Sequence, residues 1–261
     1  MSSHIGIFFN HLTKNKRKME QNLFFPGYES HSIMTSSSSR KGKSNKVRKK
    51  FKLNKEELFH SDLYGERPQY YTTPLPALVP YRGETPTRLV PFHEAYANKD
   101  YSCTVHFFID DLLFIRVLRN PEKYLGFFQR CHSVIGTDLS QYADMSAEDR
   151  YFCAYINSAF SAYLQRNGVH IIPNITWSLP DSYHYSWSSM PRNSVVAVNC
   201  KGILKHDLSQ YLWYRGYFEA VSTLHPSLIV RFGNKMPGEY TAISIFFDNE
   251  RLMFMRYGRK W

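Results

Sequence analysis

Short apolar runs alternate with longer, helically spaced segments from Ser102 to the end of the chain. The runs read TVHFFID, SVIG, VHIIPNITW, SVVAVNC, SLIVRF and AISIFF. They are almost continuously apolar, which is typical of parallel strands that are covered on both faces. Strands that alternate with amphipathic helices indicate βαβ units. The pattern therefore predicts an α/β fold with a mostly parallel sheet and flanking helices, either open or arranged as an incomplete (β/α) barrel.

Three stretches between these runs have the spacing and the end signals of helices. The first, DLLFIRVLRNPEKYLGFFQRC, divides into two pieces at Pro121, because proline cannot continue a helix. In the second, SAEDRYFCAYINSAFSAYLQRNG, Ser146 is suited to cap the start and Gly168 to end the helix. The third covers about residues 207–224. We expect all three to flank the sheet.

A proline-rich segment precedes this regular part. Residues 68–91 contain six of the 13 prolines, which fix φ and remove backbone donors, so neither a helix nor a central strand is expected there. The interleaved Tyr, Leu and Val residues make the segment too apolar for a free linker, and we expect an extended arm over the surface of the body. The chain then divides into a basic tail (1–58), this arm (59–100) and an α/β domain (101–261).

The net charge is concentrated at the N-terminus. The chain carries a formal charge of +11, and residues 1–55 hold 13 of its 33 basic and two of its 22 acidic residues, which leaves 20 of each for the rest. A segment this charged and poor in apolar residues is expected to be disordered. Its charge favours a nucleic-acid backbone as the partner of residues 14–55, with a solubilising tail or a localisation signal as alternatives. The residues predicted to contact nucleic acid are Arg40, Lys41, Lys43, Lys46, Arg48, Lys49, Lys50, Lys52 and Lys55.

Nothing in the composition indicates a membrane or an oxidising compartment. The four cysteines are scattered, without the spacing of a zinc site or of a disulfide framework. No run of about 18 apolar residues suggests a membrane span. The apolar patch IGIFFNHL precedes its positive charges, which is the reverse of the order in a signal peptide. We expect a soluble, cytoplasmic protein.

Polar residues follow the predicted strands, at the edge where parallel α/β folds bind ligands. Asp110 and Asp111 follow the first strand and Asp138 follows the second, and these three are the candidate catalytic residues. Asp111 directly precedes LLFIRVL, where it suits a helix cap as well as it suits chemistry, so Asp110 is the better site candidate. Candidate ligand-binding residues at the later strand ends are Asn174, Trp177, Ser178, Asn199, Lys201 and Arg231.

Converging carboxylates support two kinds of chemistry. Asp110 and Asp138 could bind a divalent ion such as Mg²⁺, which prefers oxygen ligands, or a pair of carboxyl groups could act as acid and base. The patterns GxxxxGK[ST] and GxGxxG do not occur, so no nucleotide cofactor is predicted. The aromatic loop WSLPDSYHYSW could stack on a base or a sugar, but we favour a lid that packs against the body by its own aromatic side chains.

Several of these segments, taken in order, resemble an uncharacterised family from bacteria, phages and mobile elements, the domain of unknown function 4417. The similarity covers about residues 86–233 and rests on VHFFIDD, RNPEKYL, IGTDLSQYADM, AYLQRNGVHIIPNITWS, PRNSVVAVNCKG, RGYFEAV and HPSLIVRFG. The resemblance implies no particular reaction. It adds Tyr142 to the candidate ligand-binding residues, because the family's recurring polar positions fall on Asp110, Asp111, Asp138, Tyr142, Trp177 and Ser178.

Three functions are compatible with these features. The first is a phage or mobile-element accessory protein that associates with nucleic acid through its basic tail. The second is an enzyme of the metal-assisted hydrolase type, with its site among the strand-end carboxylates. The third is a structural or assembly component of a particle, whose tail contacts a packaged genome.

Overall fold

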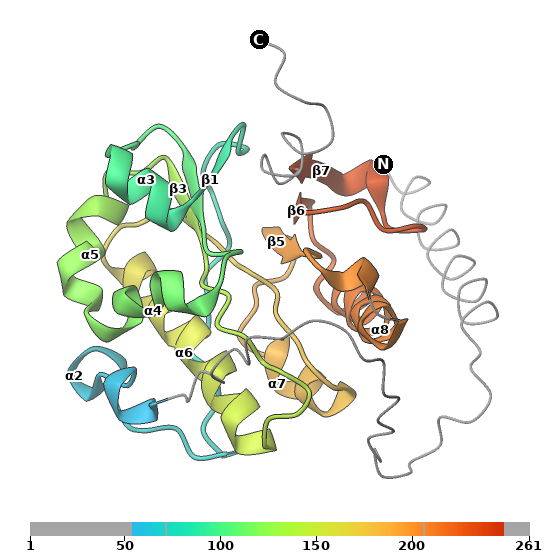
Figure 1. The fold of residues 1–261 in the computed structure, drawn as a ribbon, viewed down its shortest axis with the longest axis horizontal. Coiled ribbons are helices and arrows are strands. Elements are labelled where there is room, and N and C mark those ends of the chain that lie inside the picture. Colours follow the sequence, from blue (N-terminus) through green and yellow to red (C-terminus); the bar gives the residue numbers. More distant parts are fainter. Residues whose placement is uncertain (1–53, 71, 206, 248–261) are drawn as a thin grey trace, which may run out of the picture. The chain divides into compact units, whose positions relative to one another are not determined.

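All strands of the described residues are parallel and pair in the order in which they occur along the chain (Figure 1). The structure, a computed structural model, describes residues 54–247 apart from residues 71 and 206. The first sheet contains β1 (Leu89–Pro91), β2 (Thr104–His106), β3 (Ser133–Ile135) and β4 (Ile171–Ile172). The second contains β5 (Val195–Asn199), β6 (Leu228–Phe232) and β7 (Ser244–Phe247).

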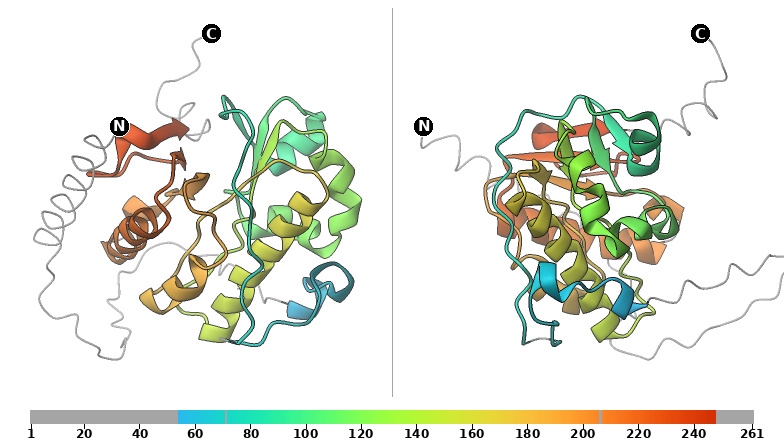
Figure 2. Two further views of the ribbon diagram at one scale, coloured as in Figure 1. Left: turned by 180° about the vertical axis from the view of Figure 1, so that it is seen from behind. Right: turned by 90° about the vertical axis from the view of Figure 1, so that its left-hand side faces the viewer.

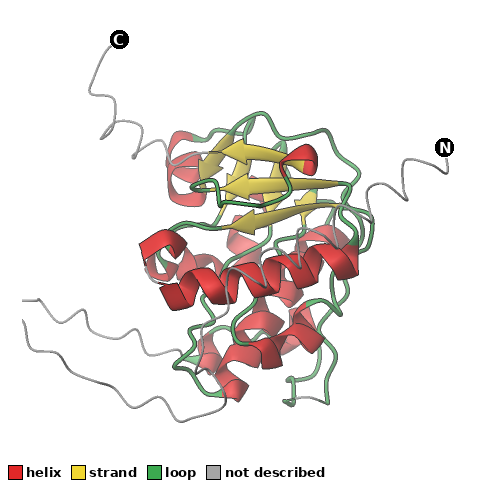
Figure 3. Ribbon diagram, turned by 90° about the vertical axis from the view of Figure 1, so that its right-hand side faces the viewer, coloured by secondary structure: helices red, strands yellow, loops and turns green. Residues whose placement is uncertain are grey.

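Helices lie between the strands and flank both sheets, as the views in Figures 2 and 3 show. The α-helices are α2 (Ser61–Tyr64), α3 (Phe92–Asn98), α4 (Asp111–Arg119), α5 (Pro121–Phe128), α6 (Ala147–Arg166), α7 (Tyr183–Ser186) and α8 (Asp207–Leu224). The short 3-10 helices are η1 (Lys55–Glu57), η2 (Pro180–Ser182), η3 (Ile203–Lys205) and η4 (Thr241–Ile243). Helix α6 is buried continuously along most of its length, which makes it the central helix of the domain.

The apolar core draws on strands of both sheets. Leu89 of β1, Ile135 of β3 and Ile172 of β4 cluster with Ala197 of β5 and Val230 of β6. A parallel bridge at Ala197 also joins the end of β4 to β5. Sequential parallel strands around one apolar interior are the arrangement of a (β/α) barrel, although no ladder between β1 and β7 closes the ring within the described residues. The predicted α/β fold with parallel strands and flanking helices is confirmed.

The residues that were predicted to begin or end helices occupy those positions in the structure. Pro121 is the first residue of α5, where its missing N–H costs nothing. The Ser146 hydroxyl accepts a hydrogen bond from the Asp149 N–H at 3.1 Å and caps α6. Gly168 follows the end of this helix with a φ of 80°, a left-handed conformation that glycine adopts without strain. The predicted bounds of α8 agree with the structure.

Most of the proline-rich arm that precedes β1 forms neither helix nor strand. Leu75 and Leu78 are buried, and the Leu78 N–H donates to the Ser189 carbonyl at 2.8 Å. The Tyr81 N–H donates to the Ser194 hydroxyl at 3.0 Å, which fixes the arm beside β5. The arm is shorter than predicted, because β1 and α3 already lie within residues 59–100. Proline is tolerated in β1 because this strand is at the edge of its sheet.

Lys55 belongs to the folded unit that contains the described strands and helices. Its ammonium forms an ion pair with Asp149 at 2.7 Å and lies 5.5 Å from the centre of the Phe152 ring. Lys55 was predicted to bind nucleic acid, which stays a prediction beside these contacts within the domain. The rest of the predicted basic tail, through residue 53, lies outside the described residues. Among the described helices, none is long and apolar enough to cross a membrane.

Candidate functional site

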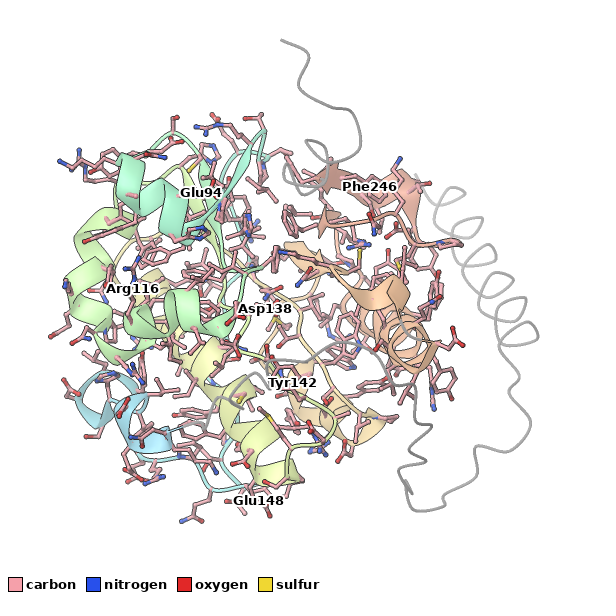
Figure 4. The ribbon with its side chains drawn as sticks, in the orientation of Figure 1. Glu94, Arg116, Asp138, Tyr142, Glu148 and Phe246 are labelled. Atoms are coloured by element: carbon pink, nitrogen blue, oxygen red, sulfur yellow. The ribbon has the colours of Figure 1, made fainter. Side chains whose placement is uncertain are left out.

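The carboxyl ends of three strands bring one carboxyl group and two amides together. Asp138 follows β3, Asn174 follows β4 and Asn199 ends β5. The Asn199 Nδ2 donates to Asp138 Oδ2 at 3.0 Å, and the Asn174 Nδ2 approaches Asp138 Oδ1 at 3.4 Å. Asp138 lies near the middle of the view in Figure 4, among the elements that follow the strands. The structure thus brings together three of the side chains that the sequence placed at strand ends.

The adjacent residues Asp110 and Asp111 have different environments. The exposed Asp110 accepts a hydrogen bond from the Leu112 N–H at 3.0 Å and caps α4. Asp111 is only 9% exposed, and it accepts hydrogen bonds from the hydroxyl and the N–H of Ser140 at 3.2 and 3.4 Å. Assigning the cap to Asp111 is therefore wrong. The cap is the residue just before the first helical one, and that residue is Asp110.

Burial and a neighbouring charge shift the protonation of the two carboxyl groups. Burial, and then the nearby charge of Asp138, raise the pKa of Asp111 from 3.8 to about 7, against the opposing effect of the Ser140 hydrogen bonds. Burial also raises the pKa of Asp138, although the hydrogen bonds from Asn199 and Asn174 favour its charged form. The Asp111 carboxyl therefore holds its proton to a higher pH than an ordinary aspartate does.

Two carboxyl groups, without a basic partner, make up the acidic part of this site. Within the described ranges, neither Asp111 nor Asp138 forms an ion pair. In the same ranges, no group of three or more His, Cys, Asp or Glu side chains could hold a metal ion. The charge that acts on Asp111 most strongly is that of Asp138, whereas Asp110, the predicted metal partner of Asp138, is occupied as a helix cap. The arrangement is better suited to proton transfer than to the predicted cation site.

The residues after β5 fix the amide of Asn199. The Lys201 N–H donates to Asn199 Oδ1 at 2.8 Å, which leaves the amide nitrogen directed at Asp138. Gly233 has a φ of 97°, and a Cβ there would lie 2.9 Å from the Lys201 nitrogen, so only glycine fits. The Lys201 side chain is exposed. The burial of His106, and then the positive charge of Lys201, lower the pKa of His106 to about 3. His106 is therefore a neutral core histidine at pH 7.

Arg231, a predicted ligand contact, is fully buried in β6. Its Nε donates to Glu239 Oε2 at 2.5 Å, and its Nη1 donates to the Val198 carbonyl at 3.0 Å. The guanidinium carbon also lies 4.9 Å from the centre of the Trp213 ring. The side chains of Arg231 and Glu239 are 0% and 1% exposed. These contacts give Arg231 a structural role and leave no face of it open to a ligand.

The aromatic loop packs against helix α8. The Trp177 indole donates from Nε1 to the Leu212 carbonyl at 3.1 Å. It lies so close to Gly216 that a Cβ there would come within 2.1 Å of the indole nitrogen. The ring centres of Trp177 and Trp187 are 5.9 Å apart, and Tyr183 stacks on Trp187 at 5.4 Å. The favoured prediction, a lid packed by its own aromatic side chains, is confirmed by these contacts.

The remaining candidates, Ser178 and Tyr142, differ in exposure. Ser178 is buried at the start of the aromatic loop, where its N–H donates to the Ser182 hydroxyl at 3.0 Å. Tyr142 is 57% exposed, in the loop that follows β3. Sequence reasoning missed Ser140, which holds the Asp111 carboxyl. The available signal was its position two residues after Asp138, in the same short loop.

Comparisons with known proteins find sequence similarity to two phage proteins. The chain is 28% identical over 144 residues to the Gene 1 protein of Mycobacterium phage L5, which covers 55% of this chain and 62% of that protein. It is also 28% identical over 144 residues to the Gene 1 protein of Mycobacterium phage D29. That alignment covers 55% of this chain and 53% of the phage D29 protein. The chain thus spans less than two thirds of the length of either relative. No solved structure matches it.

A family match extends over most of the described residues. The model of a family described as "Domain of unknown function (DUF4417)" matches residues 69–249. The match contains the predicted region of resemblance, together with both sheets and both carboxyl groups of the site. Because it covers more than half of the chain, the chain belongs to the DUF4417 family.

Proposed function

We propose that Asp111 and Asp138 form the acid–base centre of a hydrolase. The observation that carries this proposal is the buried Asp111 and the half-buried Asp138, neither of which forms an ion pair within the described residues, beyond the carboxyl ends of parallel strands. Enzymes with this kind of fold bind their substrates at that edge. A group that titrates near pH 7 is also the most effective acid or base at that pH, because it is available in both forms.

The surroundings favour a different role for each carboxyl group. Asp138 receives two amide donors, which favour its charged form, so it is suited to take a proton from an attacking water molecule. Asp111, with a pKa of about 7, is suited to deliver a proton to the leaving group. Within the described residues, no basic side chain forms an ion pair with either carboxyl group and so offsets their repulsion of a phosphate. The substrate class that fits is therefore a neutral ester, amide or glycoside.

Titration of the aspartate carboxyl carbons by NMR tests the pair directly. We expect one carboxyl of the wild-type protein to titrate near pH 7. Asp138→Asn should lower that pKa, because it removes the neighbouring like charge. Asp110→Asn is the matched control, since Asn caps a helix as well as Asp does. The Asp110 charge acts on Asp111 more weakly than the Asp138 charge, so this variant should lower the pKa of Asp111 less than Asp138→Asn does. An ordinary aspartate pKa for Asp111 in the wild-type protein would contradict the proposal.

Hydrolysis of a panel of p-nitrophenyl esters and glycosides tests the chemistry. Asp111→Asn and Asp138→Asn should each reduce turnover by about 10²-fold or more, as removal of a general acid or base does. Asp110→Asn should keep wild-type turnover. Hydrolysis that survives Asp138→Asn unchanged would remove the acid–base role of the pair.

We also propose that the protein associates with nucleic acid through residues 14–55. The observation in favour is that the entire net charge of +11 falls within residues 1–55, whereas the remainder of the chain is neutral. The similarity to two phage proteins is compatible with such a role. Each phosphate neutralised by a basic side chain releases counterions, so binding of this kind weakens steeply with salt.

A mobility-shift series with duplex DNA and with single-stranded RNA at several salt concentrations tests this second function. Neutralising the eight basic residues from Arg40 to Lys52 with Gln should weaken binding and flatten its salt dependence, by roughly 0.7–0.9 in logarithmic slope for each phosphate that is no longer neutralised. Neutralising the exposed Lys99 and Lys123 serves as the control and should change little. Equal binding by the eight-residue variant and the wild-type protein would refute a role for this segment.

A further inference from the structure

A small cavity lies next to Asn174, one of the two residues that hold Asp138. Its volume is about 10 Å³. Side chains from the ends of β3 and β4, from α6 and from α7 line it, and most of them carry hydroxyl or amide groups. Polar walls of this kind distinguish it from an apolar packing defect, which stays dry.

Three oxygen atoms of residues that line this cavity have no hydrogen-bond partner within the described part of the chain. They are Thr137 Oγ1, Asn174 Oδ1 and Ser186 Oγ. The three residues are 1%, 5% and 3% exposed, so bulk water does not satisfy these atoms. Folded proteins pair nearly all of their buried polar atoms, and three such atoms around one cavity call for a common partner. The amide oxygen can only accept, whereas the two hydroxyls can donate and accept.

We propose that this cavity binds one ordered water molecule, which holds the Asn174 amide in the orientation that Asp138 requires. A space of roughly 10–15 Å³ takes a single water molecule, and buried water usually makes about three hydrogen bonds. The bound water donates to Asn174 Oδ1 and completes its bonding with the hydroxyls of Thr137 and Ser186. A larger ligand does not fit a space of this size.

The amide orientation matters because Asn174 Nδ2 serves two acceptors. It donates to the Thr137 carbonyl at 3.1 Å and to Asp138 Oδ1 at 3.4 Å. If the amide turned over, its oxygen would face both acceptors and Asp138 would lose a donor. A water molecule that donates to Asn174 Oδ1 opposes that turn. Thr137 and Ser186 are therefore positioning residues for Asp138. The water site stands on its own, and only this coupling rests on the proposed function.

A high-resolution crystal structure of the full chain, compared with that of Thr137→Val/Ser186→Ala, tests the water site. We expect one water peak within hydrogen-bond distance of the three oxygen atoms in the wild-type protein, and its loss in the double variant. Ser161→Ala is the matched control, because Ser161 lines the same cavity but its hydroxyl already donates to the Asn157 carbonyl at 2.7 Å. The control should keep the water. A dry cavity in the wild-type protein overturns the proposal.

The carboxyl titration tests the coupling in the same variants. Loss of the water should raise the pKa of Asp138, because the Asn174 donor that favours its charged form is lost. The pKa should stay at its wild-type value in Ser161→Ala. An unchanged pKa in a double variant that has lost the water refutes the positioning role. If the double variant does not fold, Ser186→Ala alone should show the same shift to a smaller extent. An ordinary wild-type titration with the water present rejects the acid–base pair but not the water site.

Discussion

Replacing Asp111 by Asn should stabilise the protein at pH 8 and leave its stability almost unchanged at pH 4. The unfolded chain ionises this residue near pH 4, whereas the folded protein does so at about pH 7. Between these values the folded state binds more protons than the unfolded state, so its stability falls as the pH rises. The difference of about three pKa units, at 1.36 kcal/mol each, sets an upper limit of about 4 kcal/mol on the gain above pH 7. Asn retains the acceptor for the Ser140 hydroxyl and carries no charge.

Urea denaturation at pH 4, 6 and 8 measures this effect. The midpoints of the wild-type protein and the variant can be compared if their m-values are equal. The gain should be absent at pH 4, partial at pH 6 and full at pH 8. Asp110→Asn provides the baseline, because it removes a charge one residue away at an exposed cap and should shift the midpoint little at any pH. A stability change in Asp111→Asn that is the same at pH 4 and pH 8, or a loss at pH 8, would refute the buried, proton-holding carboxyl.

Further variants probe the structural contacts around the site. Asp110→Ala should cost about 0.5–2 kcal/mol of unfolding free energy through loss of the α4 cap, while Asp110→Ser restores it, and urea midpoints compare the two. Arg231→Met should cost about 3–5 kcal/mol in a thermal melt, because it leaves the Glu239 carboxylate buried and unpaired. Adding Glu239→Gln should recover part of that loss, and no recovery would contradict the ion-pair account. Gly216→Ala should destabilise α8 and shift the tryptophan fluorescence, because the new Cβ collides with Trp177, even though Ala favours a helix by about 1 kcal/mol. A rise in melting temperature would speak against that contact.

The strands that the sequence predicted are those with an uninterrupted apolar run. TVHFFID, SVIG and the four later runs became β2 to β7 because burial on both faces leaves a strong compositional pattern. Strand β1 escaped prediction because Leu89–Pro91 has only three residues and ends on proline. Its position at the sheet edge permits that proline, but a sequence does not show which strand lies at an edge.

The sequence predicted where the candidate site lies, at the carboxyl ends of the strands, but it predicted only some of the residues that form it. That polar residues gather at strand ends follows from parallel topology, so Asp138, Asn174 and Asn199 could be found. The roles of Asp110 and Asp111 depend on where α4 begins, and a shift of one residue exchanges the exposed cap for the buried carboxyl. Arg231 was mistaken for a ligand contact because its partner, Glu239, lies in a later loop that no periodicity connects to β6.

Because each strand pairs with the strand before it in the chain, the two sheets can form progressively while the protein leaves the ribosome. The proline-rich arm is different, since the hydrogen bond of the Tyr81 N–H requires the Ser194 hydroxyl, which is 113 residues further along the chain. Closing so long a loop costs chain entropy before any contact offsets it. A nascent chain released before Ser194 would therefore lack the acceptor of the Tyr81 N–H and the later strand residues, Ala197 and Val230, that pack with Tyr81. The Tyr81 end of the arm thus closes later than the pairing of β1 to β4, and in a truncated chain it is a segment that a protease could cut or a chaperone could bind.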